Sequence, residues 1–290
     1  MRFSSPVLPK ASNLLDAGEV ARRAGGGSAK AKMGEASTAL KATVAAAFAA
    51  AIAAAWVIAA AQLPPYILPS PQKVAASALA FFGSARQIGH LQATLFHIGA
   101  SIALSFVAGA LLALAAHYAR WSAPAIHQRL SPFLNAFSGI GWTLLAVIWF
   151  GVSTPTVVFS ISVVLLPFAL INLREGLEAL DREIGEMSRS FGRNDWRQFA
   201  LIVAPALLPF IAATLRIMFG VAWKVALTAE LFGGSQGLGY LINIARQEYD
   251  TETIFTVIIF IILAVYLADR FIFQPIERYT ARQFGGQVAR

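Results

Sequence analysis

The sequence contains no cysteine, and charged residues make up only 13% of its 290 residues. The absence of cysteine excludes disulfides, thiolate metal sites and cysteine nucleophiles. The four histidines do not form a zinc site of the usual closed types without help from carboxylates, so no metal site is predicted. Soluble domains carry roughly 25% charged residues, so the low share here argues against a soluble protein.

Long apolar runs stand where the charges are missing. Hydrophobic residues make up 57% of the chain, and a membrane-spanning helix needs about 20 predominantly apolar residues. Six candidate runs occur: Ala42–Ala61, Ala93–Ala116, Phe133–Phe150, Pro155–Leu173, Ile202–Leu231 and Ile254–Phe273. They do not alternate apolar and polar residues as the strands of a membrane barrel do. The sequence therefore predicts an all-α integral membrane protein with six transmembrane helices.

The first run has a second interpretation. The small residues Ala59-Ala60-Ala61 before Gln62 are typical of a signal-peptidase site. A cleavable apolar core is usually only about 7–15 residues long, which is shorter than this run. We therefore predict an uncleaved first helix.

The positions of lysine and arginine predict the orientation of the chain. With the N-terminus inside, 18 of the 23 Lys and Arg residues lie in cytoplasmic segments and 3 lie in outer segments. Cytoplasmic loops carry such an excess, so both termini are predicted to be cytoplasmic. The positive net charge follows from this bias and does not indicate binding of nucleic acid. Residues 1–40 are predicted to be a basic flexible tail, either a solvated linker or a contact for anionic lipid.

A short helix is predicted in the outer segment Leu63–His90. Ser70 can cap it, Pro71 can begin it, and it should end near Gly83. Its apolar residues fall on one side. The helix is therefore expected either to lie in the outer membrane interface or to pack against the bundle.

The most informative segment is the predicted cytoplasmic loop, residues 174–200. Its apolar residues step by three and four, as on one face of an amphipathic helix: Leu177, Leu180, Ile184, Met187 and Phe191. Gly192 follows where a left-handed cap is favoured, and Asn194 can cap a second helix. An ordered turn that projects from the membrane is expected to contact a cytoplasmic partner. The alternative is an amphipathic connector that packs on the bilayer.

This loop resembles the EAA loop of ABC-importer permeases. Four residues match that pattern at its spacing: Glu186, Gly192, Ile202 and Pro205. Met187 and Ser188 replace the two alanines, and Ala204 replaces a leucine. Other segments resemble permeases of the nitrate, sulfonate and taurine importer group: Leu68-Pro69-Ser70-Pro71, Leu215-Arg216, Ala222-Trp223, Ala229-Glu230 and Gly237-Leu238-Gly239-Tyr240. The resemblance covers about residues 63–275.

The resemblance implies a MetI-like permease bundle in residues 41–275, followed by a cytoplasmic tail in residues 276–290. In that family the loop docks into a cleft of the ATPase subunit. The coupling residues here would be Glu186, Met187, Ser188, Phe191, Gly192, Ile202 and Pro205. The implied partners are an ATPase subunit dimer, a second permease copy in a homodimer, an extracytoplasmic solute-binding protein and membrane lipid.

The sequence has no Gly-x-x-x-x-Gly-Lys-Ser/Thr motif. ATP hydrolysis is therefore expected in a separate subunit, and the chain is predicted to be no enzyme and to bind no cofactor.

Three charged residues interrupt the fifth apolar run: Arg216, Lys224 and Glu230. Charges inside a membrane bundle usually face its interior, and at about 100° per residue all three can share one surface. They are candidates for the translocation path of a small anionic solute of the nitrate, sulfonate or taurine type. Structural ion pairs are the alternative for Arg216 and Glu230, and packing is the favoured role for His97.

The sequence thus predicts the permease subunit of a bacterial ABC importer in the inner membrane, working by alternating access. The alternative is a stand-alone secondary transporter or channel. Such a protein should show inverted repeats or broken helix pairs in both halves, and none is apparent. A membrane enzyme would need acidic and histidine residues clustered at one membrane face, but the four histidines are scattered.

Overall fold

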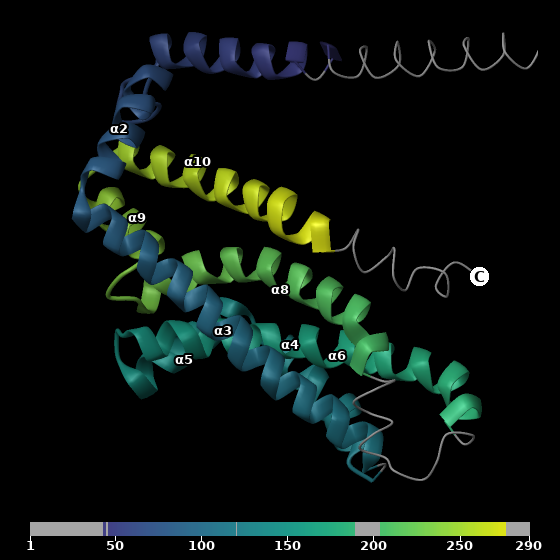
Figure 1. Ribbon diagram of the computed structural model, residues 1–290. Helices are drawn as coiled ribbons and strands as arrows, with labels where there is room; N and C mark the ends of the chain where they lie inside the picture. The colour runs from purple at the N-terminus through teal and green to yellow at the C-terminus, as the bar shows by residue number, and fades with distance from the viewer. Residues whose placement is uncertain (1–42, 45, 120, 189–203, 277–290) are drawn as a thin grey trace, which may run out of the picture. The chain divides into compact units, whose positions relative to one another are not determined.

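The computed structural model describes residues 43–44, 46–119, 121–188 and 204–276 (Figure 1). The chain forms two units, residues 1–64 and residues 65–290, and each is described by itself. In the first unit an apolar helix runs over Ala46–Gln62. Pro64 lies just beyond its end, where a residue without an amide donor cannot continue a helix.

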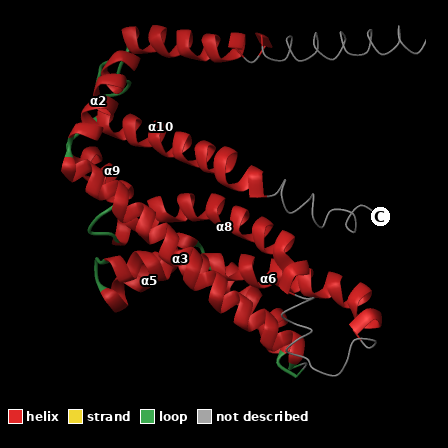
Figure 2. Cartoon of the chain, in the orientation of Figure 1, coloured by secondary structure: helices red, strands yellow, loops and turns green. Residues whose placement is uncertain are grey.

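In the second unit every regular element among the described residues is a helix (Figure 2). The elements follow one another as α2 (Pro71–Gly83), α3 (Ala85–Tyr118), η1 (Pro124–Leu130), α4 (Ser131–Ala136), α5 (Gly139–Phe150), α6 (Thr154–Ser188), α8 (Ala204–Gly233), α9 (Leu238–Gln247), α10 (Thr251–Ala268) and η3 (Asp269–Phe273). The two η segments are π-helical.

Four segments of this unit are long and apolar enough to cross a membrane: Ala85–Tyr118, Thr154–Ala179, Leu207–Gly233 and Thr251–Ile276. A bent pair, Pro124–Ala136 with Gly139–Phe150, makes a fifth if it is taken as one span. The predicted all-α membrane architecture is confirmed, with four or five spans among the described residues.

The bent pair differs from the continuous span that the sequence predicted over Phe133–Phe150. α4 and α5 meet at a bend of 86°. Ser138 at the bend is extended, and its hydroxyl accepts a hydrogen bond from the Gly141 amide at 3.2 Å, so this residue caps a new helix. A Cβ on Gly141 would lie 2.6 Å from the Phe137 ring, so glycine allows the ring to pack against the first turn of α5.

The core of the unit lies where α6 packs along both α3 and α8, as Figure 1 shows. Its fully buried residues include Ile161, Leu165 and Ala169 of α6 and Met218, Ala222 and Ala226 of α8. Gly109 brings α3 close to α6, because an added Cβ would lie 2.6 Å from the Ala169 Cβ. The facing stripes of these three helices are therefore buried against one another, whereas large apolar residues elsewhere on them, such as Phe96, Leu104 and Ile217, are exposed.

Two serines of α3 carry polar bonds through this core. The Ser101 hydroxyl donates to the Val158 carbonyl at 3.1 Å, and the Ser105 hydroxyl donates to the Ser162 carbonyl at 2.9 Å. A hydroxyl inside a membrane needs such a partner, because the hydrocarbon offers none.

The short helix predicted after the first apolar run occupies the expected residues, because α2 begins at Pro71 and ends at Gly83. The Ser70 side chain makes no capping hydrogen bond, so the fixed φ of proline is the local signal that starts this helix. α2 packs on α10, where Phe81 stacks on Phe260 with ring centroids 5.7 Å apart. Packing against the bundle is thus the observed arrangement of the two that the sequence allowed.

Candidate functional site

A groove of about 640 Å³ runs along α8 and the end of α10, on the surface that the charges of α8 were expected to line. Its walls are formed by Ala213, Arg216, Ile217, Phe219, Gly220, Val221 and Lys224 of α8 with Val265, Asp269 and Phe273. Arg216, Gly220 and Lys224 follow one another at four-residue steps, so they lie on one stripe of the helix. Gly220 leaves room between the two cations, because no atom would lie within 4 Å of an added Cβ.

Arg216 forms an ion pair across this groove. Its Nε donates to Oδ1 of Asp269 at 2.8 Å, and Nε2 of Gln274 donates to the other carboxylate oxygen at 3.2 Å. The side chains of Arg216 and Asp269 keep 37% and 36% of their surface exposed, so the pair lies at the wall of the groove and not within the core. The ion pair that the sequence left open for Arg216 is therefore present.

Lys224 lies two turns further along α8 and is exposed. Among the described residues, no carboxylate forms an ion pair with its ammonium. Lys224 is one of the residues that line the groove. The groove thus contains one neutralised and one unneutralised cation.

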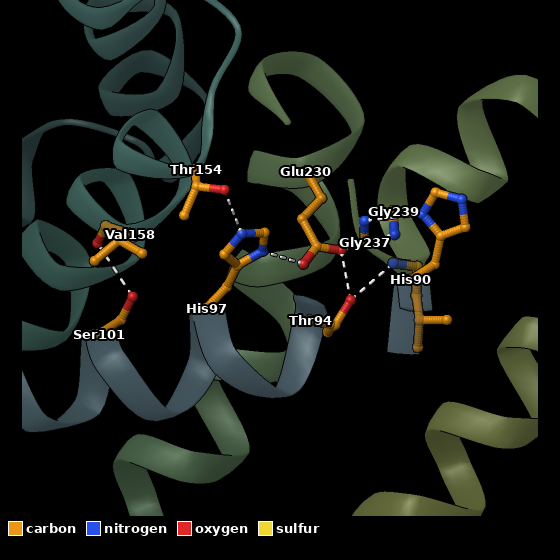
Figure 3. A network of polar contacts seen from close by, with 10 residues as sticks. His90, Thr94, His97, Ser101, Thr154, Val158, Glu230, Gly237 and Gly239 are labelled. Carbon is orange, nitrogen blue, oxygen red and sulfur yellow. Dashed lines mark hydrogen bonds and ion pairs between the residues drawn. The ribbon is translucent and has the colours of Figure 1, made fainter. Parts of the chain in front are cut away.

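Glu230 does not join this groove. It lies about 120° around the helix from Lys224 and is fully buried. Its Oε2 accepts the Thr94 hydroxyl and the Gly239 amide, both at 2.9 Å, and its Oε1 is 2.8 Å from Nδ1 of His97 (Figure 3). The structure therefore brings Arg216 and Lys224 together and places Glu230 in a separate buried network.

This network joins four helices. The Thr94 hydroxyl accepts the Leu238 amide at 2.7 Å, and Nδ1 of His90 accepts the Gly237 amide at 3.3 Å. Nε2 of His97 lies 3.3 Å from the Thr154 hydroxyl at the start of α6. Figure 3 shows these groups converging on the turn between α8 and α9.

Sequence reasoning gave His97 a packing role and did not single out Thr94 or Thr154. The spacing of three between Thr94 and His97 places both on one helix face, and this was the available signal.

The predicted coupling residues that the structure describes lie at the other end of α6 and α8. Glu186, Met187 and Ser188 are the last residues of α6, and Pro205 is the second residue of α8. Phe191, Gly192 and Ile202 lie outside the described residues. α6 is continuous from Thr154 to Ser188, so the helix predicted in the loop extends the preceding span.

Known proteins resemble this chain over most of its length. Residues 105–273 match the family model described as binding-protein-dependent transport system inner membrane component. A Bacillus subtilis permease assigned to the transport of aliphatic sulfonates is 26% identical over 206 residues, which cover 71% of this chain and 74% of the relative. The taurine transport system permease protein of Escherichia coli is 26% identical over 74% of this chain and 80% of its own.

A third relative has a different solute in its name. The riboflavin transport system permease protein of Chloroflexus aurantiacus is 31% identical over 196 residues, which cover 66% of this chain and 71% of the relative. The family match spans more than half of the chain, and the structure supplies several apolar helices for a multi-pass protein of the inner membrane. Members of this family work with a separate ATPase and a binding protein. The chain belongs to the family of binding-protein-dependent transport system inner membrane components, the permease subunits of ABC importers.

Proposed function

We propose that this chain, paired with a second copy of itself, forms the path of a small anionic solute, and that ATP-driven alternating access moves the solute inward. The observation that carries the proposal is the groove along α8, where Lys224 has no ion-pair partner among the described residues. An ammonium inside a membrane protein is expensive to hold without a negative charge nearby. A passing anion would supply that charge for the time of its passage.

The charges of the groove favour a monoanion. Arg216 is neutralised by Asp269, so Lys224 leaves the three charged side chains with a net charge of one positive. The interaction must also remain weak, because a tightly held solute would not be released. A single exposed ammonium meets both conditions, since exposed charges interact weakly.

The relatives support an acidic solute but do not impose one. Two of them are named for aliphatic sulfonates and for taurine, whose sulfonate groups are anionic. The relative named for riboflavin is of comparable similarity, so family membership alone leaves the solute open. The argument for an anion therefore rests on Lys224.

The topology belongs to the same proposal. The chain would cross the membrane six times, with both termini in the cytoplasm, and the loop of residues 174–200 would dock into the ATPase. The length of α6 supports this role, because one helix joins Ser188 to the core of the bundle. Glu186, Met187, Ser188, Phe191, Gly192, Ile202 and Pro205 would form the docking turn.

Uptake by cells that express this chain with its ATPase and binding protein tests the role of Lys224. With nitrate, ethanesulfonate and taurine as probes, Lys224→Met should raise the half-saturating concentration about two- to fivefold, because an exposed charge that contributes up to about 1 kcal/mol is lost. Lys224→Arg should preserve uptake. Lys73→Met is the matched control, because Lys73 pairs with Glu252 on α10 at 3.4 Å and lies outside the groove. Uptake by Lys224→Met with unchanged affinity would contradict the anion path.

A further inference from the structure

α9 begins without a side-chain cap of its own. The N-cap position is Gly237, which has no side chain and lies at φ +117° and ψ 172°. The first amides of any helix lack acceptors within the helix, and Gly237, Leu238 and Gly239 are buried, so bulk water does not reach them. Acceptors for the start of α9 must therefore come from other parts of the chain.

Two neighbouring helices supply those acceptors. The Leu238 amide donates to the Thr94 hydroxyl of α3 at 2.7 Å, and the Gly239 amide donates to Glu230 of α8 at 2.9 Å. The Gly237 amide donates to Nδ1 of His90 at 3.3 Å. The acceptors for three successive amides thus come from helices other than α9, as Figure 3 shows.

The two glycines make this approach possible. A Cβ on Gly237 would collide with the Glu230 carboxylate, and the backbone there has a positive φ that side chains rarely adopt. A Cβ on Gly239 would collide with the Leu227 carbonyl and lie 2.8 Å from the Glu230 Cβ. The Gly237-Leu238-Gly239 sequence therefore serves as a seat for one carboxylate.

The carboxylate is in turn held from α3. Glu230 has no exposed surface, and its Oε1 lies 2.8 Å from Nδ1 of His97 on α3. Thr94 donates its hydroxyl to Glu230 while it accepts the Leu238 amide. The buried polar groups of this network therefore find their hydrogen-bond partners within the protein and not in bulk water.

We propose that Glu230 is a positioning residue, which clamps α9 to the ends of α3 and α8 so that these three segments move as one body during transport. α8 carries both ends of the connection, because Pro205, one of the predicted coupling residues, is its second residue and Glu230 lies three residues before its end. A displacement of α8 would then reach α9 directly. This last step rests on the proposed coupling at Pro205, whereas the clamp itself does not.

Cysteine labelling can measure how firmly α9 is held, and it needs no partner protein. Because the chain has no native cysteine, an introduced cysteine is the single site that reacts. Ala245 on α9 and Ala113 on α3 are both only 2% exposed, so they form a matched pair of reporter positions. Ala245→Cys reports the docking of α9, and Ala113→Cys reports the integrity of the bundle. Each would be introduced into the full chain, purified in detergent and reacted with N-ethylmaleimide.

With Glu230→Ala, the labelling rate at position 245 should rise about tenfold or more, because buried donors lose their acceptor. Glu230→Gln should give a smaller rise, since its carbonyl oxygen still accepts. Thr94→Val removes one hydroxyl at nearly constant volume and should also raise labelling at 245 alone. The rate at position 113 should stay unchanged in all three. An unchanged rate at 245, or an equal rise at both positions, would overturn the clamp.

Uptake kinetics test whether α9 and the ends of α3 and α8 move together during transport. Glu230→Gln should lower the maximal uptake rate and leave the half-saturating concentration within about twofold, whereas a solute ligand would change that concentration. A Glu230→Gln or Thr94→Val protein with a loosened α9 and full uptake would refute the joint movement. That result would leave the role of Lys224 intact, so the two proposals fail separately.

Discussion

His97 of α3 and Glu230 of α8 are 133 residues apart in the sequence, yet Nδ1 and Oε1 lie 2.8 Å apart and both side chains are buried. This contact completes the set of hydrogen-bond partners around the buried carboxyl group of Glu230. His97→Ala should lower the free energy of unfolding by about 1–3 kcal/mol, because the buried Oε1 of Glu230 then loses its partner in His97. Chemical unfolding in detergent micelles measures the change.

The control for this change is Gln92→Ala, at an exposed position five residues before His97 on α3. It should alter stability by less than about 0.5 kcal/mol. Equal stability of His97→Ala and Gln92→Ala would show that the contact contributes nothing.

Gly237 is the position where substitution should be least tolerated. Gly237→Ala should lower the free energy of unfolding by about 1–3 kcal/mol from backbone strain alone, with the collision against Glu230 added. Gly83→Ala at the end of α2 is the matched control, because no atom lies within 4 Å of its added Cβ. The same unfolding measurement compares them, and similar values for the two variants would count against the seat for the carboxylate.

Asp269 should influence which solute charge, one negative or two, the groove favours. Asp269→Asn leaves Arg216 without its carboxylate and raises the net charge of the groove by one. Competition between sulfate and nitrate for uptake should shift towards the dianion by about two- to fivefold, the range for a partly exposed charge. Glu252→Gln, which removes the carboxylate that pairs with Lys73 outside the groove, should leave the ratio unchanged. A shift of equal size in both variants would argue against a role for the groove.

The orientation of the chain can be measured with single cysteines. Ser235→Cys, at an exposed position in the turn between α8 and α9, should react with a membrane-impermeant maleimide added to intact cells. Ser188→Cys at the end of α6 should react only after the membrane is opened. Labelling of position 188 from outside would reverse the proposed topology.

Local signals predicted much of this fold. Pro71 and Gly83 bound α2 as expected, because a fixed φ and a flexible residue act within their own turn. The apolar runs located α3, α6, α8 and α10 for the same reason, since length and hydrophobicity are properties of each segment alone. Arg216 and Lys224 share a groove because helical spacing alone places them on one stripe.

Contacts between distant residues were beyond this reasoning. α9 is short, and the groups that cap its start are Thr94 and Glu230, the first of them 144 residues before Leu238. Glu230 was expected to share a helix surface with Lys224, because helical angles allow it. Instead its side chain is buried, with hydrogen-bond partners on α3 and at the start of α9. The bend at Ser138 likewise depends on one side chain bonding to the backbone inside an otherwise apolar run.

Ser105 bears on the order in which the helices enter the membrane. Its hydroxyl donates both to the Ser101 carbonyl of its own helix, at 2.6 Å, and to the Ser162 carbonyl of α6. Because α3 is synthesised before α6, the bond within α3 is available to the emerging helix while its later partner does not yet exist. α3 can therefore insert alone with this hydroxyl already satisfied, and the Ser162 carbonyl of α6 accepts a second hydrogen bond from it when α6 arrives.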